Sequence, residues 1–210
     1  MDTAALFCYY LYVVIDYPGD PMPPHPDQQL QERILKAAQR LWRTRGERGL
    51  TLRAVAREAG TTTPTVYKRF RNKQALQLAL AERFRAQLNQ ACFSAPSLEK
   101  VYKAYLGYAE KNPHEYQLLW GNWTDIFHPE KPRPGRTWLL TQLAKRFGGN
   151  PEDYARAFYA LFLMCHGAST LLAIPGDEIA HNEVRENFIS ICDTLFENIE
   201  LFRKKEPVGS

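Results

Sequence analysis

Three helix-start signals stand close together in the first half of the chain, and they leave this stretch few ways to fold. Thr51 and Asn72 are preferred N-cap residues, and Thr62 or Thr63 can take the same role between them. Gly60 supplies the backbone freedom that a tight turn between two helices requires. The stretch therefore predicts two short helices joined by a turn at Gly60, with a longer third helix after them.

The second of these short helices is small, polar and basic. Lys68, Arg69, Arg71 and Lys73 lie on it or beside it. A tight helix pair with such a second member has the geometry that fits the major groove of DNA. This stretch therefore indicates a DNA-binding protein.

Charge is divided unevenly along the chain. Residues 27–93 hold 14 Lys and Arg against 5 Asp and Glu, a net charge of +9, and the remainder holds 13 basic and 18 acidic residues, a net charge of −5. Such an asymmetry suggests a basic head that meets a polyanion and an acidic body with another role.

Composition is that of an ordinary globular protein, with 45% hydrophobic and 24% charged residues. The four cysteines, Cys8, Cys92, Cys165 and Cys192, show no metal-ligand spacing, which fits a reducing cytoplasm. We expect their side chains to fill apolar space in the core, and redox sensing is the alternative. The longest apolar stretch, residues 3–15, is too short to cross a bilayer and lacks the basic leader of a signal peptide.

Residues 1–26 differ from the rest of the chain. An apolar, tyrosine-rich run is followed by the proline-rich stretch PGDPMPPHP, which cannot continue a helix. We expect a flexible extension. Two other interpretations stay open: upstream sequence before a start at Met22, or a segment that packs on a partner.

Helical periodicity, proline and glycine breaks, and the lack of alternating apolar residues predict an all-α fold of about nine helices. We expect a helix-turn-helix DNA-binding domain over residues 27–74, a connecting helix over 75–96, a ligand-binding and dimerisation bundle over 97–204, and a disordered tail over 205–210. The expected helices are about 27–45, 51–58, 63–70, 72–93, 98–111, 113–122, 134–147, 151–173 and 177–203.

The head resembles a known family at thirteen positions. They are Thr51, Val55, Ala56, Ala59, Gly60, Thr62, Thr65, Val66, Tyr67, Phe70, Asn72, Lys73 and Leu76. At this spacing they resemble the tetracycline-repressor (TetR) family of bacterial regulators, and the likeness extends over residues 28–93. The resemblance implies a nine-helix homodimer that leaves its operator when a small ligand binds, and the symmetry of such a dimer predicts a palindromic operator. By the same analogy, repression is favoured over activation.

Two short motifs outside the head resemble one subgroup of that family. Residues 165–167, Cys-His-Gly, look like its His-Gly (WHG-like) signature, and the Asn-Pro-His-Glu-Tyr segment at 112–116 looks like its break between helices.

The expected DNA contacts lie on the two short helices and the start of the next. They are Thr51, Arg53, Thr62, Thr63, Pro64, Thr65, Tyr67, Lys68, Arg69 and Lys73. Threonine offers a hydroxyl to a base edge or phosphate and a methyl group to thymine. Lys73 opposes the helix dipole unless a phosphate lies nearby, and Tyr67 follows the family's phosphate-binding tyrosine. Three alternatives stay open. The threonines could only cap a helix, the Tyr67 ring could lie in the core, and Arg69 could belong to a solvated helix face.

Two apolar stripes on the last two expected helices predict a dimer interface. The expected contacts are Leu161, Ala168, Leu172, Phe188, Ile191, Leu195 and Ile199. A core stripe within one subunit is the alternative.

Aromatic side chains crowd the middle helices and suit a cavity for an apolar or aromatic effector. The expected ligand contacts are Tyr105, Tyr108, Trp120, Trp123, Trp138, Phe162 and His166. Ordinary core packing is the alternative, and a satisfied core histidine is the alternative for His166.

No phosphate loop, metal-protease motif, nucleophile elbow or pair of acids stands in the sequence, so we expect neither an enzyme nor a cofactor nor a metal. The rival class is a helical interaction or membrane-associated module anchored by residues 5–15, which leaves the basic head unexplained.

Overall fold

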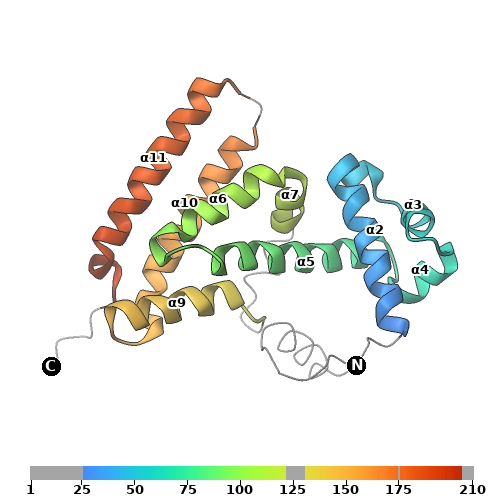
Figure 1. Cartoon of the computed structure of the whole chain (residues 1–210), viewed down its shortest axis with the longest axis horizontal. Coiled ribbons are helices and arrows are strands. Elements are labelled where there is room, and N and C mark those ends of the chain that lie inside the picture. Colours follow the sequence, from blue (N-terminus) through green and yellow to red (C-terminus); the bar gives the residue numbers. More distant parts are fainter. Residues whose placement is uncertain (1–25, 122–130, 175, 205–210) are drawn as a thin grey trace. The chain divides into compact units, whose positions relative to one another are not determined.

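The structure, a computed structural model, describes residues 26–121, 131–174 and 176–204, and this part of the chain is helical and without β-strands (Figure 1). Contacts divide the chain into two compact units, residues 1–33 and 34–210. The described part of the first unit is the beginning of helix α2. The second unit holds all the other described helices.

The head of the second unit consists of the remainder of α2 (Pro26–Gly49), α3 (Leu52–Glu58) and α4 (Thr63–Arg69). The predicted caps are present: the Thr51 hydroxyl accepts from Ala54 N at 3.1 Å, and the Thr62 hydroxyl accepts from Thr65 N at 3.4 Å. Gly60 has a φ of 62°, so the turn between α3 and α4 uses the left-handed conformation that glycine tolerates. The predicted pair of short helices is confirmed.

An apolar underside fixes the two short helices. Val55 of α3 and Val66 of α4 have no exposed surface, and Phe70 is 5% exposed directly after α4. Helices α3 and α4 also pack against each other. Helices of seven residues are not stable in isolation, so this burial holds α4 in place.

Helix α2 is interrupted at Gly46, where φ is 57° and ψ is −150°. The sequence predicted an end near Arg45, and the helical residues after the break run on to Gly49. Because side chains disfavour this backbone conformation, glycine is what allows the chain to turn here.

The body begins with α5 (Lys73–Phe93), which is capped by Asn72 and buries Leu76, Leu80, Phe84 and Leu88 as predicted. The elements after it are η1 (Leu98–Lys100), α6 (Val101–Lys111), α7 (Pro113–Gly121), α9 (Pro134–Phe147), η2 (Pro151–Tyr154), α10 (Ala155–Leu172), α11 (Glu178–Glu197) and η3 (Ile199–Phe202). The last two predicted helices are thus shorter, with 3-10 turns at one end. None of the described helices is both long and apolar enough to cross a membrane.

The core of the body lies among α6, α9, α10 and α11, and α10 packs beside α11 (Figure 1). Tyr102, Tyr154 and Cys192 have no exposed surface there. Burial raises the pKa of the Cys92 and Cys192 thiols to about 12, which disfavours reactive thiolates. Cys165 is also buried and free, so these three cysteines fill apolar space. Cys8 lies outside the described residues.

Two glycine-to-alanine substitutions should act in opposite directions. Gly46→Ala places a Cβ at a positive φ and should lower the free energy of unfolding by about 1–3 kcal/mol. Gly107→Ala, inside α6 with open space around the new methyl group, should raise it by up to about 1 kcal/mol. Urea unfolding followed by circular dichroism measures both, and a stabilising Gly46→Ala would contradict the break in α2.

Candidate functional site: a basic helix-turn-helix and a cavity in the body

The exposed surface of α3 and α4 carries most of the predicted DNA contacts. Arg53, Pro64, Tyr67 and Lys68 are exposed, and the Tyr67 ring at 54% is not a core ring. Thr63, Thr65 and Arg69 are half-buried and lie on the same short helix. The structure therefore brings these residues together on and around α4.

Two of the predicted threonine contacts have structural roles. Thr51 caps α3, and Thr62 caps α4 while its hydroxyl lies 2.8 Å from that of Thr65. A hydroxyl that accepts from a backbone amide can still donate its own proton. Capping and DNA contact are thus compatible at these positions.

Lys73 has a partner within the protein. Its ammonium donates to the backbone oxygen of Glu47 at 3.3 Å and lies 3.6 Å from Oε1 of the same residue. This contact ties the start of α5 to the end of α2. A phosphate would have to share the ammonium with Glu47.

A buried carboxylate connects the head to the body. Glu115 of α7 has no exposed surface, and the Nε of Arg43 on α2 donates to its Oε1. The hydroxyl of Tyr108 on α6 donates to Oε2 at 2.9 Å. Beside this pair, Nε1 of Trp42 donates to the backbone oxygen of His114 at 2.6 Å. One end of α7 is therefore fastened to α2 by two polar contacts.

The sequence prediction missed Glu115 and Arg43. In the sequence these two residues look like solvent-exposed charges on two separate helices. The segment 112–116 stood out only as a break between helices. Tyr108 belongs to this link and not to the cavity. Its pKa is raised, first by burial and then by the charge of Glu115.

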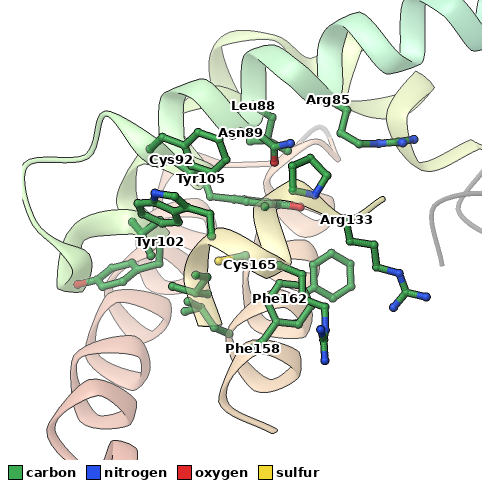
Figure 2. A pocket seen from close by; sticks show the side chains of 18 of the residues that line it. Arg85, Leu88, Asn89, Cys92, Tyr102, Tyr105, Arg133, Phe158, Phe162 and Cys165 are labelled. Atoms are coloured by element: carbon green, nitrogen blue, oxygen red, sulfur yellow. The ribbon is translucent and has the colours of Figure 1, made fainter. Parts of the chain in front are cut away.

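A cavity of about 140 Å³ lies within the body, lined by residues of α5, α6, α7, α9 and α10 (Figure 2). Of the predicted ligand contacts, Tyr105, Trp120, Trp138 and Phe162 line it. Tyr108 and His166 do not, and Trp123 lies outside the described residues. The sequence prediction missed the polar lining, chiefly Arg85, Asn89, Arg133 and Arg136.

Asn89 and Gly135 show how closely α5 approaches α9 beside the cavity. A Cβ at Gly135 would come within 2.6 Å of Oδ1 of Asn89. Glycine at this position therefore leaves room for the amide, which points toward the cavity in Figure 2.

A hydrogen-bonded chain runs from the cavity to the histidine behind it. The hydroxyls of Tyr105 and Tyr116 lie 3.2 Å apart, and the Tyr116 hydroxyl lies 2.8 Å from Nδ1 of His166. The His166 ring is stacked on that of Phe162, with 6.1 Å between centroids. His166 thus supports the cavity wall as a satisfied histidine, and Tyr116 joins that wall to α7.

The predicted dimer contacts lie mostly in the core of a single chain. Leu161, Phe188, Leu195 and Ile199 are at most 5% exposed, Ala168 is 7% exposed, and Leu172 packs on the same core. These side chains pack within the subunit, Leu172 only partly buried, and their part in an interface stays a prediction. Ile191 alone of the predicted set is exposed, at 53%.

Six large apolar side chains, Ile191 among them, form a set that is exposed on or directly after the same two helices. It consists of Leu163, Leu171 and Ile174 on and after α10 and Ile179, Ile191 and Leu201 on and after α11, each more than half exposed. We call it the exposed apolar row. Leu163, Gly167 and Leu171 follow each other at intervals of four residues, so they share one face of α10.

Among the described residues no group of three or more histidine, cysteine, aspartate or glutamate side chains could hold a metal ion. What the site offers is a basic helix-turn-helix, an aromatic cavity and a polar link between them.

This arrangement of helices is similar to that of known proteins. Residues 34–80 match the model of the family described as bacterial regulatory proteins, tetR family. A search of the curated proteins found no significant match.

Several solved structures share the fold. TetR from Acinetobacter baumannii AYE is 20% identical, with a TM-score of 0.62, over 82% of this chain and 97% of that one. A protein of unknown function from Rhodococcus sp. RHA1 is 23% identical, with a TM-score of 0.59, over 89% of this chain and 100% of that one. A variant of the Acinetobacter protein in complex with minocycline is 19% identical, with a TM-score of 0.57, over 82% of this chain and 97% of that one.

The family resemblance seen in the sequence is thereby confirmed for the head: residues 34–80 carry the tetR-family pattern, and the chain shares the fold of the TetR structure. The His-Gly subgroup stays a prediction.

Stability should fall as the pH is lowered through the titration range of His166. Burial lowers the pKa of this imidazole below its ordinary value of 6.5. At a pH well above 6.5 the imidazole is neutral in both the folded and the unfolded state. Below it the unfolded chain takes up a proton that the folded protein resists, so acidification favours unfolding.

Urea midpoints at about pH 7.5 and 5.5 measure this dependence. His166→Gln should reduce the loss of stability between the two pH values, and His114→Gln, at an exposed histidine of α7, serves as the control. An unchanged pH dependence in His166→Gln would contradict the assignment.

Proposed function

We propose that the protein is a homodimeric, cytoplasmic repressor that binds a palindromic operator and is released when a small apolar or aromatic ligand occupies the cavity. The observation that carries the proposal is α4, a short capped helix with a buried underside and an exposed basic face. In this proposal residues 27–74 form the DNA-binding domain, 75–96 the connecting helix, and 97–204 the ligand-binding and dimerisation domain.

Ligand release of DNA requires that the ligand favour one of two arrangements of the head. Helix α7 is well situated to transmit such a preference. Its Trp120 lines the cavity, its Tyr116 bonds to Tyr105 of the cavity wall, and its Glu115 holds Arg43 of α2. A ligand that shifts α7 would therefore alter the orientation of α2.

The similarity to a minocycline complex supports the ligand-binding part of the proposal, since that protein shares the fold and holds a small molecule. The rival interpretation, a helical or membrane-associated module, depends on residues 5–15, which lie outside the described residues. The tetR-type head favours the regulator over that rival.

Variants of the predicted DNA contacts should distinguish residues that contact phosphates from residues that contact base edges. A duplex site is first selected from a random library, and binding is then measured on a panel of single-base variants. Thr63→Ala and Lys68→Ala should change the order of preference, because a lost base contact costs about 1–3 kcal/mol at particular positions.

Lys73→Ala should weaken all sites nearly equally and reduce the slope of log K against log salt by about one per subunit. Lys103→Ala, an exposed cation on α6, is the matched control and should bind as the wild type does. If Lys73→Ala lowered stability but left the salt slope unchanged, its contact with Glu47 would be its whole role.

The exposed apolar row should form the interface between subunits. Rows of this kind on two adjacent helices can meet a second copy as a four-helix bundle. Leu163→Glu should convert the dimer to a monomer in sedimentation velocity, because it buries a carboxylate without a partner. Gln117→Glu, an exposed position on α7, should stay dimeric. A dimer that survives Leu163→Glu and Ile191→Glu would exclude this interface.

A further inference from the structure

Glu47 lies where the end of α2 meets the start of α5. It belongs to the last turn of α2, directly after the break at Gly46, and it is exposed. Oε1 of its carboxylate accepts a hydrogen bond from Nε2 of Gln77 at 3.2 Å and lies 3.6 Å from Nζ of Lys73. Lys73 also donates to the backbone oxygen of Glu47 at 3.3 Å. One acid thus occupies two donors of α5.

Lys73 and Gln77 lie on the same face of α5. They stand four residues apart, a spacing that places two side chains one above the other on a helix. Nζ of Lys73 and Nε2 of Gln77 converge on a single carboxylate oxygen. The lysine supplies the charge, and the amide supplies a second donor. Together they form a small anion site, and Glu47 of the same chain fills it.

The surroundings of this site are more basic than acidic. An open depression in the surface is lined by Lys73, Gln77 and Glu47 together with Arg45 and Arg48. Glu47 is the one acid among the residues that line it. Because Glu47 pairs with Lys73, the two arginines leave a surplus of positive charge. Such a surface attracts a polyanion.

A phosphate of the DNA backbone can take the place of the carboxylate. Both groups are anions whose oxygens accept hydrogen bonds from ammonium and amide donors. The side chains of Lys73 and Glu47 are 42% and 69% exposed, so solvent and DNA can reach the pair. An exposed ion pair is weak, and a phosphate can therefore break it.

We propose that Lys73 and Gln77 form one site for a backbone phosphate and that Glu47 occupies this site in the DNA-free protein. The inference rests on the proposed function, because it requires that the start of α5 faces DNA. It adds Gln77 to the expected DNA contacts and makes Glu47 an internal competitor of the phosphate. When DNA binds, the carboxylate turns away and both donors pass to the phosphate.

A purely structural tie between α2 and α5 is the alternative, and it predicts the opposite effect on DNA binding. Removal of a competitor strengthens DNA binding. Removal of a tie lowers the stability of the head and weakens DNA binding. Glu47→Gln distinguishes the two, because it removes the charge with little change in size and keeps an oxygen that can accept from Gln77.

Fluorescence anisotropy of a labelled duplex, titrated with the full-length protein at low salt, tests the proposal. Glu47→Gln should bind about two- to fivefold more tightly per subunit, the range that corresponds to an exposed ion pair. The gain should be equal for a selected site and for an unrelated duplex, because phosphates carry no sequence information. Glu186→Gln, the same change of charge at an exposed residue of α11, should bind as the wild type does.

A double-mutant cycle shows whether Glu47 acts through Lys73. In the Lys73→Gln background, Glu47→Gln should no longer strengthen binding, because the donor that it releases is absent. A gain that persists there would be a general effect of charge and would overturn the proposal.

Gln77→Leu tests the second donor of the site. It should weaken both duplexes at least about twofold, since a hydrogen bond to the phosphate is lost. Gln117→Leu, at an exposed glutamine of α7 in the lining of the same depression, should leave the affinity unchanged. Equal affinities of Gln77→Leu and the wild type would remove Gln77 from the site.

Thermal unfolding of the same samples, together with Glu47→Ala as a second variant, completes the test. Glu47→Ala removes both contacts of the carboxylate and should bind DNA more tightly as well. If the wild type binds a duplex but neither variant at Glu47 binds it more tightly, the inference fails and the proposed function stands. If the wild type and all variants fail to bind a duplex at low salt, the proposed function itself fails.

Discussion

The buried carboxylate of Glu115 is the contact on which the arrangement of head and body depends. A carboxylate with no exposed surface is unfavourable unless charged and hydrogen-bonding partners surround it. Arg43 of α2 and Tyr108 of α6 supply those partners, so α7 keeps its position only while both neighbouring helices keep theirs. Helix α2 leads along the chain into α3 and α4, so the link through Glu115 holds the helix that precedes the helix-turn-helix.

Helix α7 is short, with nine residues, but it meets three parts of the protein. Glu115 faces the head, Tyr116 joins the tyrosine–histidine chain behind the cavity, and Trp120 lines the cavity itself. A shift in any of these contacts must be accommodated by the others, because a helix moves largely as a rigid element. The molecule therefore has a physical basis for coupling an occupied cavity to the orientation of its DNA-binding helix.

Periodicity in the sequence identified the apolar helices of the body but not their neighbours. The stripe of Phe188, Leu195 and Ile199 was expected at an interface, with a core stripe as the alternative, and its side chains are buried within the subunit. An apolar stripe predicts burial, and it does not say which surface covers it. Of the exposed apolar row the sequence prediction included only Ile191, because the other side chains are interrupted by polar and small residues such as Thr194 and Gly167.

The sequence by itself determined the head and the local helices. Caps at Thr51, Thr62 and Asn72, and the turn at Gly60, depend on residues a few positions apart, so they can be read directly from the chain. Only the tertiary structure decided the arginine lining of the cavity and the burial of Glu115. Arg43 and Glu115 are 72 residues apart, and charged residues on separate helices look like solvated surface until the fold brings them together.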